Sequence, residues 1–569
     1  MKQIFMVYLK PFYHRMLFGV FFKFTGSIMD LFLPYILAYI IDNVIPQNNK
    51  MEIYYWGIVM LVCSIIGVAF NIIANRMAAR VGSDATEVIR HDLFTRVMYL
   101  SSHQMDRITK PSVISRLTTD TYNIHQMIIR IQRLGIRAPI MLIGGIIVTI
   151  TLDPVLAAVL IGMMPIMVII ITLISKKSIP LFGALQQTID RFVRLVREDI
   201  SGIRVIKALS KTDYEKARFE AINAEVVNRE RIARTTIAVI QPAMNVCLNL
   251  GLVCVVLVGA YGVNQGTSEV GKILAFMTYF AIILQAVRSV SSIFETWTKA
   301  TASADRINRV LALEAELTIP AGDQKASDYY LEVENITFSY NKKEPNLANI
   351  SFALKRGETL GIIGETGAGK STLLKLLMRL YDVDDGAIYI DGRNVKSIPL
   401  GELHQHFGVV FQNDIIFEAS IEENIGLERN LSKEETEKAI LYAGAKEFVD
   451  EKADRSGEAL TIKGANLSGG QKQRILIARA LAAQPDILIL DDSSSALDYK
   501  TDAAFRKVIK EHFGETTIII VAQRVSSILH ADHILVLENG AAIGYGKHAQ
   551  LMASCDAYRE ISDSQMGEV

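Results

Sequence analysis

A glycine-rich loop between an apolar run and a helical pattern carries the most specific chemistry in the sequence. The apolar run Leu360–Ile363 precedes it, a helical pattern follows from Leu373, and the loop reads Gly364-Glu365-Thr366-Gly367-Ala368-Gly369-Lys370-Ser371-Thr372. Glycines at this spacing let backbone N–H groups face phosphate oxygens, and the helix N-terminus adds its dipole. In such a loop the lysine reaches the β- and γ-phosphates, and the serine binds Mg²⁺. The loop therefore predicts a site for the phosphates of a nucleotide.

Two motifs further along the chain supply matching chemistry. The buried-type strand Ile487–Leu490 ends in Asp491 and Asp492. An acid at such a strand end, beside a phosphate loop, is the expected partner of Mg²⁺. Between the loop and this strand, directly before the helical run 472–483, lies Leu467-Ser468-Gly469-Gly470-Gln471. Two glycines and a serine at a helix N-terminus make a second surface that binds anions.

The order of these three motifs resembles that of an ATP-binding cassette (ABC) domain, whose signature sequence is LSGGQ. Three more positions match the family pattern: Tyr340, which would stack on adenine, Gln412, which would contact Mg²⁺ and the membrane domain, and Asp498 of the D-loop. The resemblance implies ATP and Mg²⁺ as cofactors, with Ser371, Gln412 and Asp491 at the metal. It also implies that four signature residues act in trans on ATP bound by another chain: Ser468, Gly469, Gly470 and Gln471.

Three positions depart from the family pattern. The acid after the Mg²⁺ aspartate is usually a glutamate that positions or deprotonates the attacking water, but here it is Asp492. The switch histidine expected before Arg524 is Gln523, and Ile462 replaces a glutamate ahead of the signature. An aspartate carboxylate lies about one carbon short, and an error of about 1 Å in a catalytic group costs ~10²-fold. Because glutamine also cannot take up a proton as histidine does, the sequence predicts a site that binds ATP but hydrolyses it slowly.

The composition separates a basic, apolar first half from an acidic second half. Half of the 569 residues are apolar, and the mean hydropathy is +0.27. The 60 Lys and Arg residues balance 60 Asp and Glu residues, but residues 1–310 carry a net charge of +13 and residues 311–569 a net charge of −13. These values argue against a nucleic-acid-binding protein, an ordinary soluble enzyme and a disordered chain.

Six apolar segments are long enough to cross a hydrocarbon core of about 30 Å. Their approximate ranges are 15–41, 52–75, 134–152, 154–175, 240–262 and 271–298. Two long connections, Arg76–Arg137 and Lys176–Arg234, hold ten and thirteen Lys or Arg residues. The positive-inside bias therefore places these connections, both termini and the nucleotide-binding domain in the cytoplasm. We expect a multi-pass protein of the cell membrane.

The predicted fold class combines two domains. The long connections have a helical pattern, so residues 1–310 are expected to form an all-α six-helix transmembrane domain with long cytoplasmic helical extensions. A polar stretch at 311–329 is the expected linker. Short apolar strands alternate with amphipathic helices at 330–569, which predicts an α/β P-loop nucleotide-binding domain.

Ionisable residues inside the apolar segments are candidates for a substrate cavity. Lys23 and Asp30 lie seven residues apart on one face of the first segment, and Arg288 lies near the inner end of the sixth. Ionisable groups at bilayer depth usually face a bundle interior or a water-filled cavity. Two interpretations stay open: either Lys23 and Asp30 face the substrate, or Lys23 reaches the inner interface and Asp30 pairs with another helix.

The resemblance extends over the whole chain, because Ser115–Asp120 and Glu198–Lys207 resemble segments of the cytoplasmic extensions of multidrug and lipid exporters. It implies a half-transporter that must dimerise, since each ATP in this family lies between the phosphate loop of one chain and the LSGGQ of the other. A slow site with an intact signature favours the degenerate-site half of a heterodimer, similar to bacterial multidrug exporters. Its partner would carry the catalytic Glu and His, and its substrates would be amphipathic or hydrophobic: drug-like molecules or lipids. The alternatives are a homodimeric lipid flippase and a non-transporting regulatory cassette protein.

Overall fold

The computed structural model describes residues 2–314, 316–320, 324–412, 414–429, 431–492 and 499–566. The chain forms two compact units. The first comprises Met1–Met98 and Pro111–Leu313, and the second comprises Tyr99–Lys110 and Glu314–Val569. The segment Tyr99–Lys110 therefore belongs to the second unit, although it lies inside the range 1–310.

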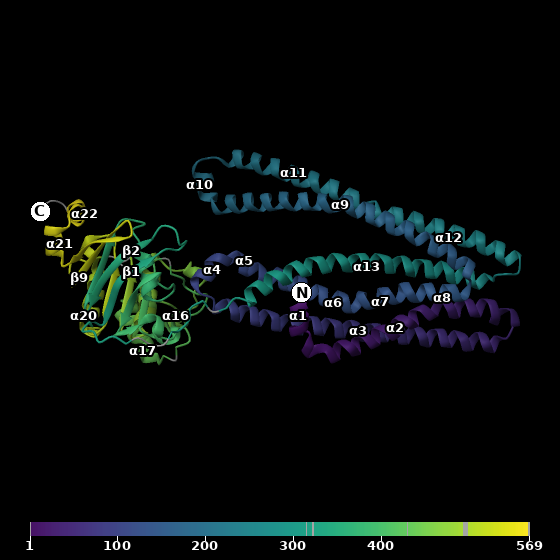
Figure 1. Cartoon of the computed structure of the whole chain (residues 1–569), viewed down its shortest axis with the longest axis horizontal. Helices are drawn as coiled ribbons and strands as arrows, with labels where there is room; N and C mark the ends of the chain where they lie inside the picture. Colours follow the sequence, from purple (N-terminus) through teal and green to yellow (C-terminus); the bar gives the residue numbers. More distant parts are fainter. Residues whose placement is uncertain are drawn as a thin grey trace. The chain divides into compact units, whose positions relative to one another are not determined.

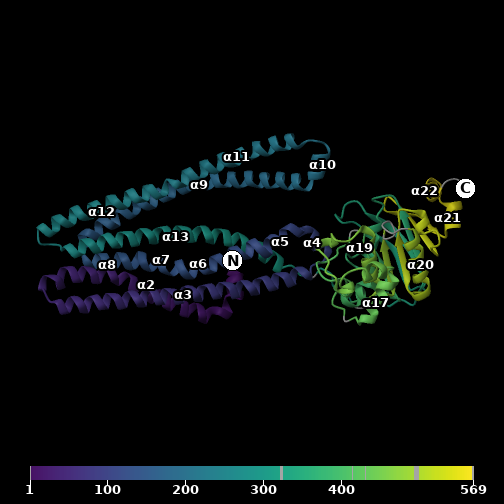
Figure 2. The ribbon, with the colours of Figure 1, turned by 180° about the vertical axis from the view of Figure 1, so that it is seen from behind.

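The first unit is helical, as Figures 1 and 2 show. Within the described residues, six helical segments are long and apolar enough to cross a membrane: Lys10–Gln47, Lys50–Met98, Lys110–Leu152, Pro154–Ser201, Thr212–Asn264 and Val270–Leu311. Most are much longer than the roughly 20 residues that a bilayer needs. This confirms the predicted six-helix architecture with helical extensions.

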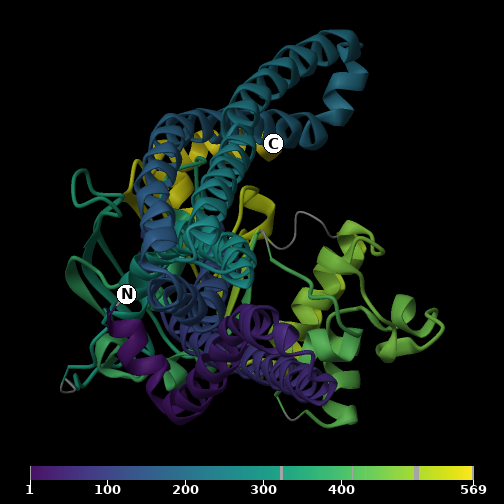
Figure 3. The same cartoon turned by 90° about the vertical axis from the view of Figure 1, so that its right-hand side faces the viewer.

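The elements of the first unit follow one another with short connections. They are α1 Lys2–Tyr8, η1 Lys10–Phe12, α2 Tyr13–Tyr39, η2 Ile40–Val44, η3 Ile45–Gln47, α3 Lys50–Met98, α5 Lys110–Ser115, η4 Arg116–Asp120, α6 Thr121–Arg130, η5 Ile131–Gly135, α7 Ile136–Pro139, η6 Ile140–Gly144, α8 Gly145–Leu152, α9 Pro154–Ser201, α10 Ile203–Ala208, α11 Thr212–Ala238, α12 Ile240–Asn264 and α13 Val270–Leu311. Helix α9 runs beside α11 and α12 as a long hairpin, which Figures 1 and 3 both show.

Local sequence signals explain where these helices start and how closely they pack. Asp153 caps α9: its Oδ1 atom accepts hydrogen bonds from the backbone N–H groups of Val155 (2.9 Å) and Leu156 (3.2 Å). Pro154 occupies the first turn of α9, where its missing N–H is not needed. Helices α2 and α3 touch at glycines, because a Cβ atom added at Gly26 would lie 3.2 Å from the carbonyl oxygen of Gly67.

The second unit is built on one sheet, to which the described residues contribute ten strands in the order β5-β4-β1-β2-β10-β9-β3-β8-β7-β6. The strands are β1 Leu331–Phe338, β2 Leu347–Leu354, β3 Thr359–Gly364, β4 Asp385–Ile390, β5 Arg393–Asn394, β6 Phe407–Val410, β7 Ile487–Asp491, β8 Thr517–Val521, β9 His533–Glu538 and β10 Ala541–Gly546. The helical elements are α4 Ser102–Ile108, α14 Lys370–Leu377, η7 Val395–Ser397, α15 Leu400–Gln405, α16 Ile421–Gly426, α17 Lys433–Tyr442, α18 Lys446–Asp450, η8 Arg455–Gly457, η9 Ile462–Gly464, α19 Gly469–Leu481, α20 Tyr499–His512, η10 Val525–Ser527, α21 His548–Ser554 and α22 Asp556–Met566.

The sheet brings the phosphate loop and the acidic strand end together. Strand β3 runs parallel to β8, and β7 runs parallel to β8 and β6. The carboxyl ends of parallel strands share one edge of a sheet, and ligands bind outside that edge. Burial explains why the strands read as continuous apolar runs, since Leu360, Ile362, Leu488 and Ile489 are all fully buried. This confirms the predicted α/β domain.

Candidate nucleotide-binding site

The phosphate loop turns sharply between β3 and α14. Gly367 (φ 92°) and Gly369 (φ 99°) both have left-handed backbone conformations that side chains rarely adopt. A Cβ atom on Gly369 would also lie 2.5 Å from the side chain of Leu347. Glycine is therefore required at Gly369 on two grounds, and the turn aims the first N–H groups of α14 out of the sheet edge.

Lys370 places its ammonium group inside this loop. Its Nζ atom donates to the carbonyl oxygens of Gly364 (2.7 Å) and Glu365 (2.8 Å). Burial lowers the pKa of Lys370, while the nearby carboxylates of Asp491 and Asp492 raise it. The same ammonium group can donate to phosphate oxygens, which are stronger acceptors than carbonyl oxygens because they are charged.

A hydroxyl and a carboxylate meet where Mg²⁺ is expected. Ser371 Oγ donates to Asp491 Oδ2 at 3.4 Å, and Asp491 is only 6% exposed. Burial raises the pKa of Asp491, while the Ser371 hydroxyl and the Lys370 charge lower it. Oxygen donors of this kind suit Mg²⁺, which usually takes one or two carboxylates together with phosphate oxygens and water. Among the described residues no group of three or more His, Cys, Asp or Glu side chains could hold a metal ion.

Tyr340 lies beside the loop, where the sequence places the adenine-stacking ring. Its hydroxyl contacts Thr372 Oγ1 at 3.3 Å, and Lys375 Nζ lies 5.5 Å from the centre of its ring. Phe338 and Tyr381 pack edge-on against the same ring. The packing fixes the orientation of Tyr340 next to the phosphate loop.

The signature residues form a separate, exposed surface. Ser468 caps α19: its hydroxyl accepts from the N–H of Gln471 (3.3 Å), and the Gln471 side chain accepts from the N–H of Ser468 (3.0 Å). Ser468 and Gly469 are exposed, and Gly470 is partly exposed. No hydrogen bond within the described part of the chain joins these residues to the phosphate loop.

The two residues that depart from the family pattern contact each other. Gln523 Nε2 donates to Asp492 Oδ2 at 2.9 Å. Burial raises the pKa of Asp492, opposed by Lys370, by Arg524 and by a hydrogen bond from Gln412. Gln412, Asp492 and Gln523 are thus brought together next to Lys370. The D-loop aspartate, Asp498, lies outside the described residues.

The membrane candidates divide into a network and a single residue. Lys23, which is 3% exposed, donates to Asn71 Oδ1 (2.9 Å) and Asn75 Oδ1 (3.2 Å). Asp30 pairs with Arg137 at 3.0 Å and accepts a hydrogen bond from Asn71. These contacts agree with the second interpretation for Asp30, which pairs with another helix. Lys23 lies buried against α3.

Arg288 stands apart from that network. Its Nε and NH2 atoms are buried and have no hydrogen-bond partner within the part of the chain that the structure describes. Sequence reasoning missed Asn71, Asn75 and Arg137. The four-residue spacing of the two asparagines in an otherwise apolar run was the available signal, because it places both amides on one helix face.

A contact around helix α4 was also not predicted. Tyr381, on the nucleotide-binding unit, donates its hydroxyl to Asp106 at 2.7 Å. Gln104 donates to the carbonyl oxygen of Glu314 at 2.8 Å, and Ser101 donates to Glu316 at 2.5 Å. A seven-residue helix from the first long connection is thereby fixed to the nucleotide-binding unit.

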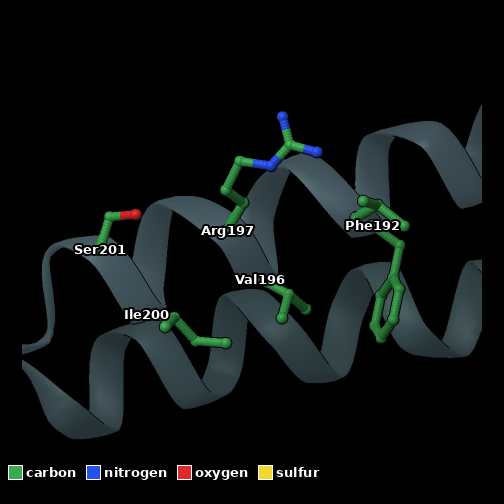
Figure 4. Close-up of a pocket in the computed structure, with 6 residues that line it drawn as sticks. Phe192, Val196, Arg197, Ile200 and Ser201 are labelled. Atoms are coloured by element: carbon green, nitrogen blue, oxygen red, sulfur yellow. The ribbon is translucent and has the colours of Figure 1, made fainter. Parts of the chain in front are cut away.

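A shallow pocket lies near the C-terminal end of α9 (Figure 4), and its lining residues are not among the predicted site residues. Its lining is largely apolar: Phe192, Val193, Val196, Arg197, Ile200 and Ser201. Ile200 is 69% exposed, and Val205 of the following helix α10 is 61% exposed. Among the described residues, this end of the hairpin therefore carries apolar side chains that stay exposed.

Comparison with known proteins decides the family. A model of the ABC transporter transmembrane region matches residues 16–287, and a model of the ABC transporter domain matches residues 347–495. The ABC transporter ATP-binding protein YfiB of Bacillus subtilis (strain 168) is 32% identical over 98% of each chain. The chain belongs to the ABC transporter family. The predicted family is thereby confirmed.

Other members of the family agree along the whole chain. The ABC transporter ATP-binding protein exp8 of Streptococcus pneumoniae serotype 4 is 29% identical, over 99% of this chain and 97% of its own. A solved structure of a bacterial Atm1-family ABC exporter with ATP bound has a TM-score of 0.82 at 23% identity and covers 98% of each chain. This likeness shows that the chain has the fold of that exporter. The ABC transporter is thus a multi-pass membrane protein with an ATP-binding domain in the cytoplasm.

Proposed function

We propose that this ABC transporter is one half of a dimeric exporter that moves amphipathic or hydrophobic compounds, drug-like molecules or lipids, across the cell membrane. Its transmembrane domain spans 1–310, its linker 311–329 and its nucleotide-binding domain 330–569, with both termini in the cytoplasm. Its own phosphate loop binds Mg²⁺ and ATP but hydrolyses ATP slowly. A homologous chain with a catalytic glutamate and histidine completes a second, competent site.

One observation carries the slow-site proposal: the hydrogen bond from Gln523 to Asp492. Hydrolysis needs a water molecule in line with the γ-phosphate and a group that positions it. The amide of Gln523 occupies one oxygen of a carboxylate that already lies about one carbon short. Glutamine cannot exchange a proton with that carboxylate, so the proton-transfer role of the histidine in a glutamate–histidine pair has no counterpart at Gln523.

The intact signature supports a role in trans. The reciprocal hydrogen bonds between Ser468 and Gln471 cap the N-terminus of α19, and Ser468 and Gly469 remain exposed. Such a surface suits the γ-phosphate of an ATP molecule bound by a second chain. The exposed apolar residues Ile200 and Val205 at the end of the α9–α11 hairpin also suit a second chain.

The substrate site is proposed around Arg288, because the contacts of Asp30 agree with its pairing to another helix. Lys23 is held by two asparagine amides and is buried, so it serves to join α2 to α3. Two nitrogens of Arg288 have no hydrogen-bond partner among the described residues, and they can donate to a polar group of a substrate.

The test is the steady-state ATPase activity of the purified transporter with two separate substitutions. Ser468→Arg should nearly abolish activity, because it blocks the competent site of the partner. Asp492→Asn should leave most of the activity, because its own site already turns over slowly. Ser554→Arg, a matched change at an exposed serine on α21, should have no effect.

Two results would contradict this proposal. Asp492→Asn as damaging as Ser468→Arg would mean that this site is the working one. Full ATPase activity of the chain without a partner would favour the homodimeric flippase. Transport into vesicles is then measured with and without the candidate partner. Both the heterodimeric exporter and the homodimeric flippase should transport substrate, whereas a regulatory protein should not.

A further inference from the structure

The last helix of the chain contacts the backbone of the residue that replaces the switch histidine. Gln565, on α22, donates from Nε2 to the carbonyl oxygen of Gln523 at 2.8 Å. The N–H of Val525 donates to Oε1 of the same side chain, also at 2.8 Å. One side-chain amide therefore joins the carbonyl group of Gln523 to the N–H group of Val525, across Arg524. We propose that Gln565 is a positioning residue of this nucleotide site, acting through Gln523 on Asp492, which rests on the assignment of those two residues to the site.

Helix α22 is fixed firmly enough to serve this purpose. Tyr558 and Ser562 are 0% and 1% exposed, and Gln565 lies seven and three residues after them on the same helix face. Tyr558 packs in one buried cluster with Ala522 and Val525. These two residues flank Gln523 and Arg524 in the sequence. The apolar face of α22 thus sets where the amide of Gln565 can reach. Figure 2 shows α21 and α22 together at the C-terminal end of the unit.

Gln523 depends on Gln565 for its backbone position, because the hydrogen bonds of the sheet end at Ala522, the residue before it. The N–H of Asp492 donates to the carbonyl oxygen of Val521 at 2.9 Å, and the N–H of Ala522 donates to that of Ile362 at 3.1 Å. These bonds fix the chain as far as Ala522. Gln523 itself is exposed, and its carbonyl oxygen is held by Gln565.

A continuous path then leads from α22 to the carboxylate beside the γ-phosphate position. Gln565 orients the peptide group of Gln523, and the Gln523 side chain donates to Asp492 Oδ2. Rotation of that peptide group would move the donor away from Asp492. Since a displacement of about 1 Å in a catalytic group costs ~10²-fold, a side chain that never touches nucleotide can set the rate at this site.

The test uses the full-length purified transporter and a site with restored chemistry. Asp492→Glu with Gln523→His should raise ATPase activity above that of the wild type. Adding Gln565→Leu should then lower this raised kcat about tenfold. A tenfold loss lies between the effect of one lost hydrogen bond and the ~10²-fold cost of displacing a catalytic group by about 1 Å. The KM for ATP should change less than about twofold, since binding residues are untouched. Ser564→Ala, the exposed neighbour on α22, is the control and should leave kcat unchanged.

A second comparison separates positioning from folding. Gln565→Glu keeps the acceptor for the Val525 N–H but loses the donor to the Gln523 carbonyl oxygen, so it should lower kcat as Gln565→Leu does. When residue 523 is changed to alanine, neither substitution should lower kcat further, because the side chain through which Gln565 acts is gone. The proposal is overturned if the Gln565 substitutions lower kcat equally with glutamine, histidine or alanine at position 523. It is also overturned if kcat falls only in variants whose melting temperature falls.

The outcome also distinguishes this proposal from the slow-site proposal. If the restored pair gives no gain, the wild-type site already works and the slow-site proposal fails. Gln565→Leu must then lower the wild-type kcat about tenfold for the positioning proposal to stand. If Gln565→Leu leaves kcat unchanged in the more active of the two backgrounds, wild type or restored pair, Gln565 only attaches α22 to the unit.

Discussion

Replacement of Arg479 by methionine should destabilise the nucleotide-binding unit strongly. Arg479 lies on α19, the signature helix, and is 7% exposed. It donates to the carbonyl oxygens of Asn424 (2.8 Å) and Ile415 (3.0 Å) and to Asn424 Oδ1 (3.1 Å). It also pairs with Asp414 at 3.5 Å. One buried guanidinium therefore fastens the signature helix to the segment that follows Gln412.

The cost follows from the groups that Arg479→Met leaves behind. Methionine fills the space of the arginine stem, so the loss is mainly electrostatic. Removing one partner of a buried pair costs about 3–5 kcal/mol, because the remaining charge and carbonyl oxygens stay buried without a donor. Separate hydrogen-bond energies would sum to more, but groups in one network are not additive. For a domain of this size the melting temperature falls by about 2–4 °C per kcal/mol, so we expect a drop of about 6–20 °C.

Differential scanning calorimetry of the full-length protein in detergent measures this drop. The matched control is Arg506→Met, which removes an i,i+4 pair with Asp502 on α20. Such a pair contributes only about 0.3–0.5 kcal/mol, so the control should shift the transition by no more than about 2 °C. If Arg479→Met shifts the transition no further than Arg506→Met does, the reasoning from buried guanidinium contacts is refuted.

Three further predictions concern nucleotide binding and topology. Lys370→Ala should weaken Mg-ATP binding about 10- to 100-fold, because charged hydrogen bonds to phosphate are lost; equal affinities for a fluorescent ATP analogue would count against the phosphate-loop assignment. Mg²⁺ requires the ionised form of Asp491, whose pKa is raised by burial, so Mg²⁺-dependent ATP binding should weaken on acidification at a higher pH than an ordinary aspartate would give. A titration of Asp491→Asn should lack this transition. A cysteine introduced at Asn48 should react with an impermeant reagent from outside the cell and one at Thr119 only from inside, and labelling of Thr119 from outside would reverse the proposed orientation.

Motifs that lie within a few consecutive residues could be predicted well from the sequence. The turn from Gly364 to Ser371 requires glycines at Gly367 and Gly369, because of their backbone conformations, and the capping serine of the signature requires Gln471 three residues later. The chemistry of such a motif lies in its own backbone, so a linear pattern identifies it. Long apolar segments likewise predict membrane helices, because their length must match the bilayer.

Contacts between distant residues were decided only by tertiary structure. Tyr381 meets Asp106 across 275 positions, Gln565 meets Gln523 across 42, and Lys23 meets Asn71 across 48. In each case no local sequence pattern specifies which distant residue the side chain will meet. The sequence alone therefore determined the family, the fold class and the phosphate chemistry, which depend on local backbone geometry and hydrophobic length. Packing determined which polar groups satisfy one another, because a buried donor takes whichever acceptor the fold places within reach.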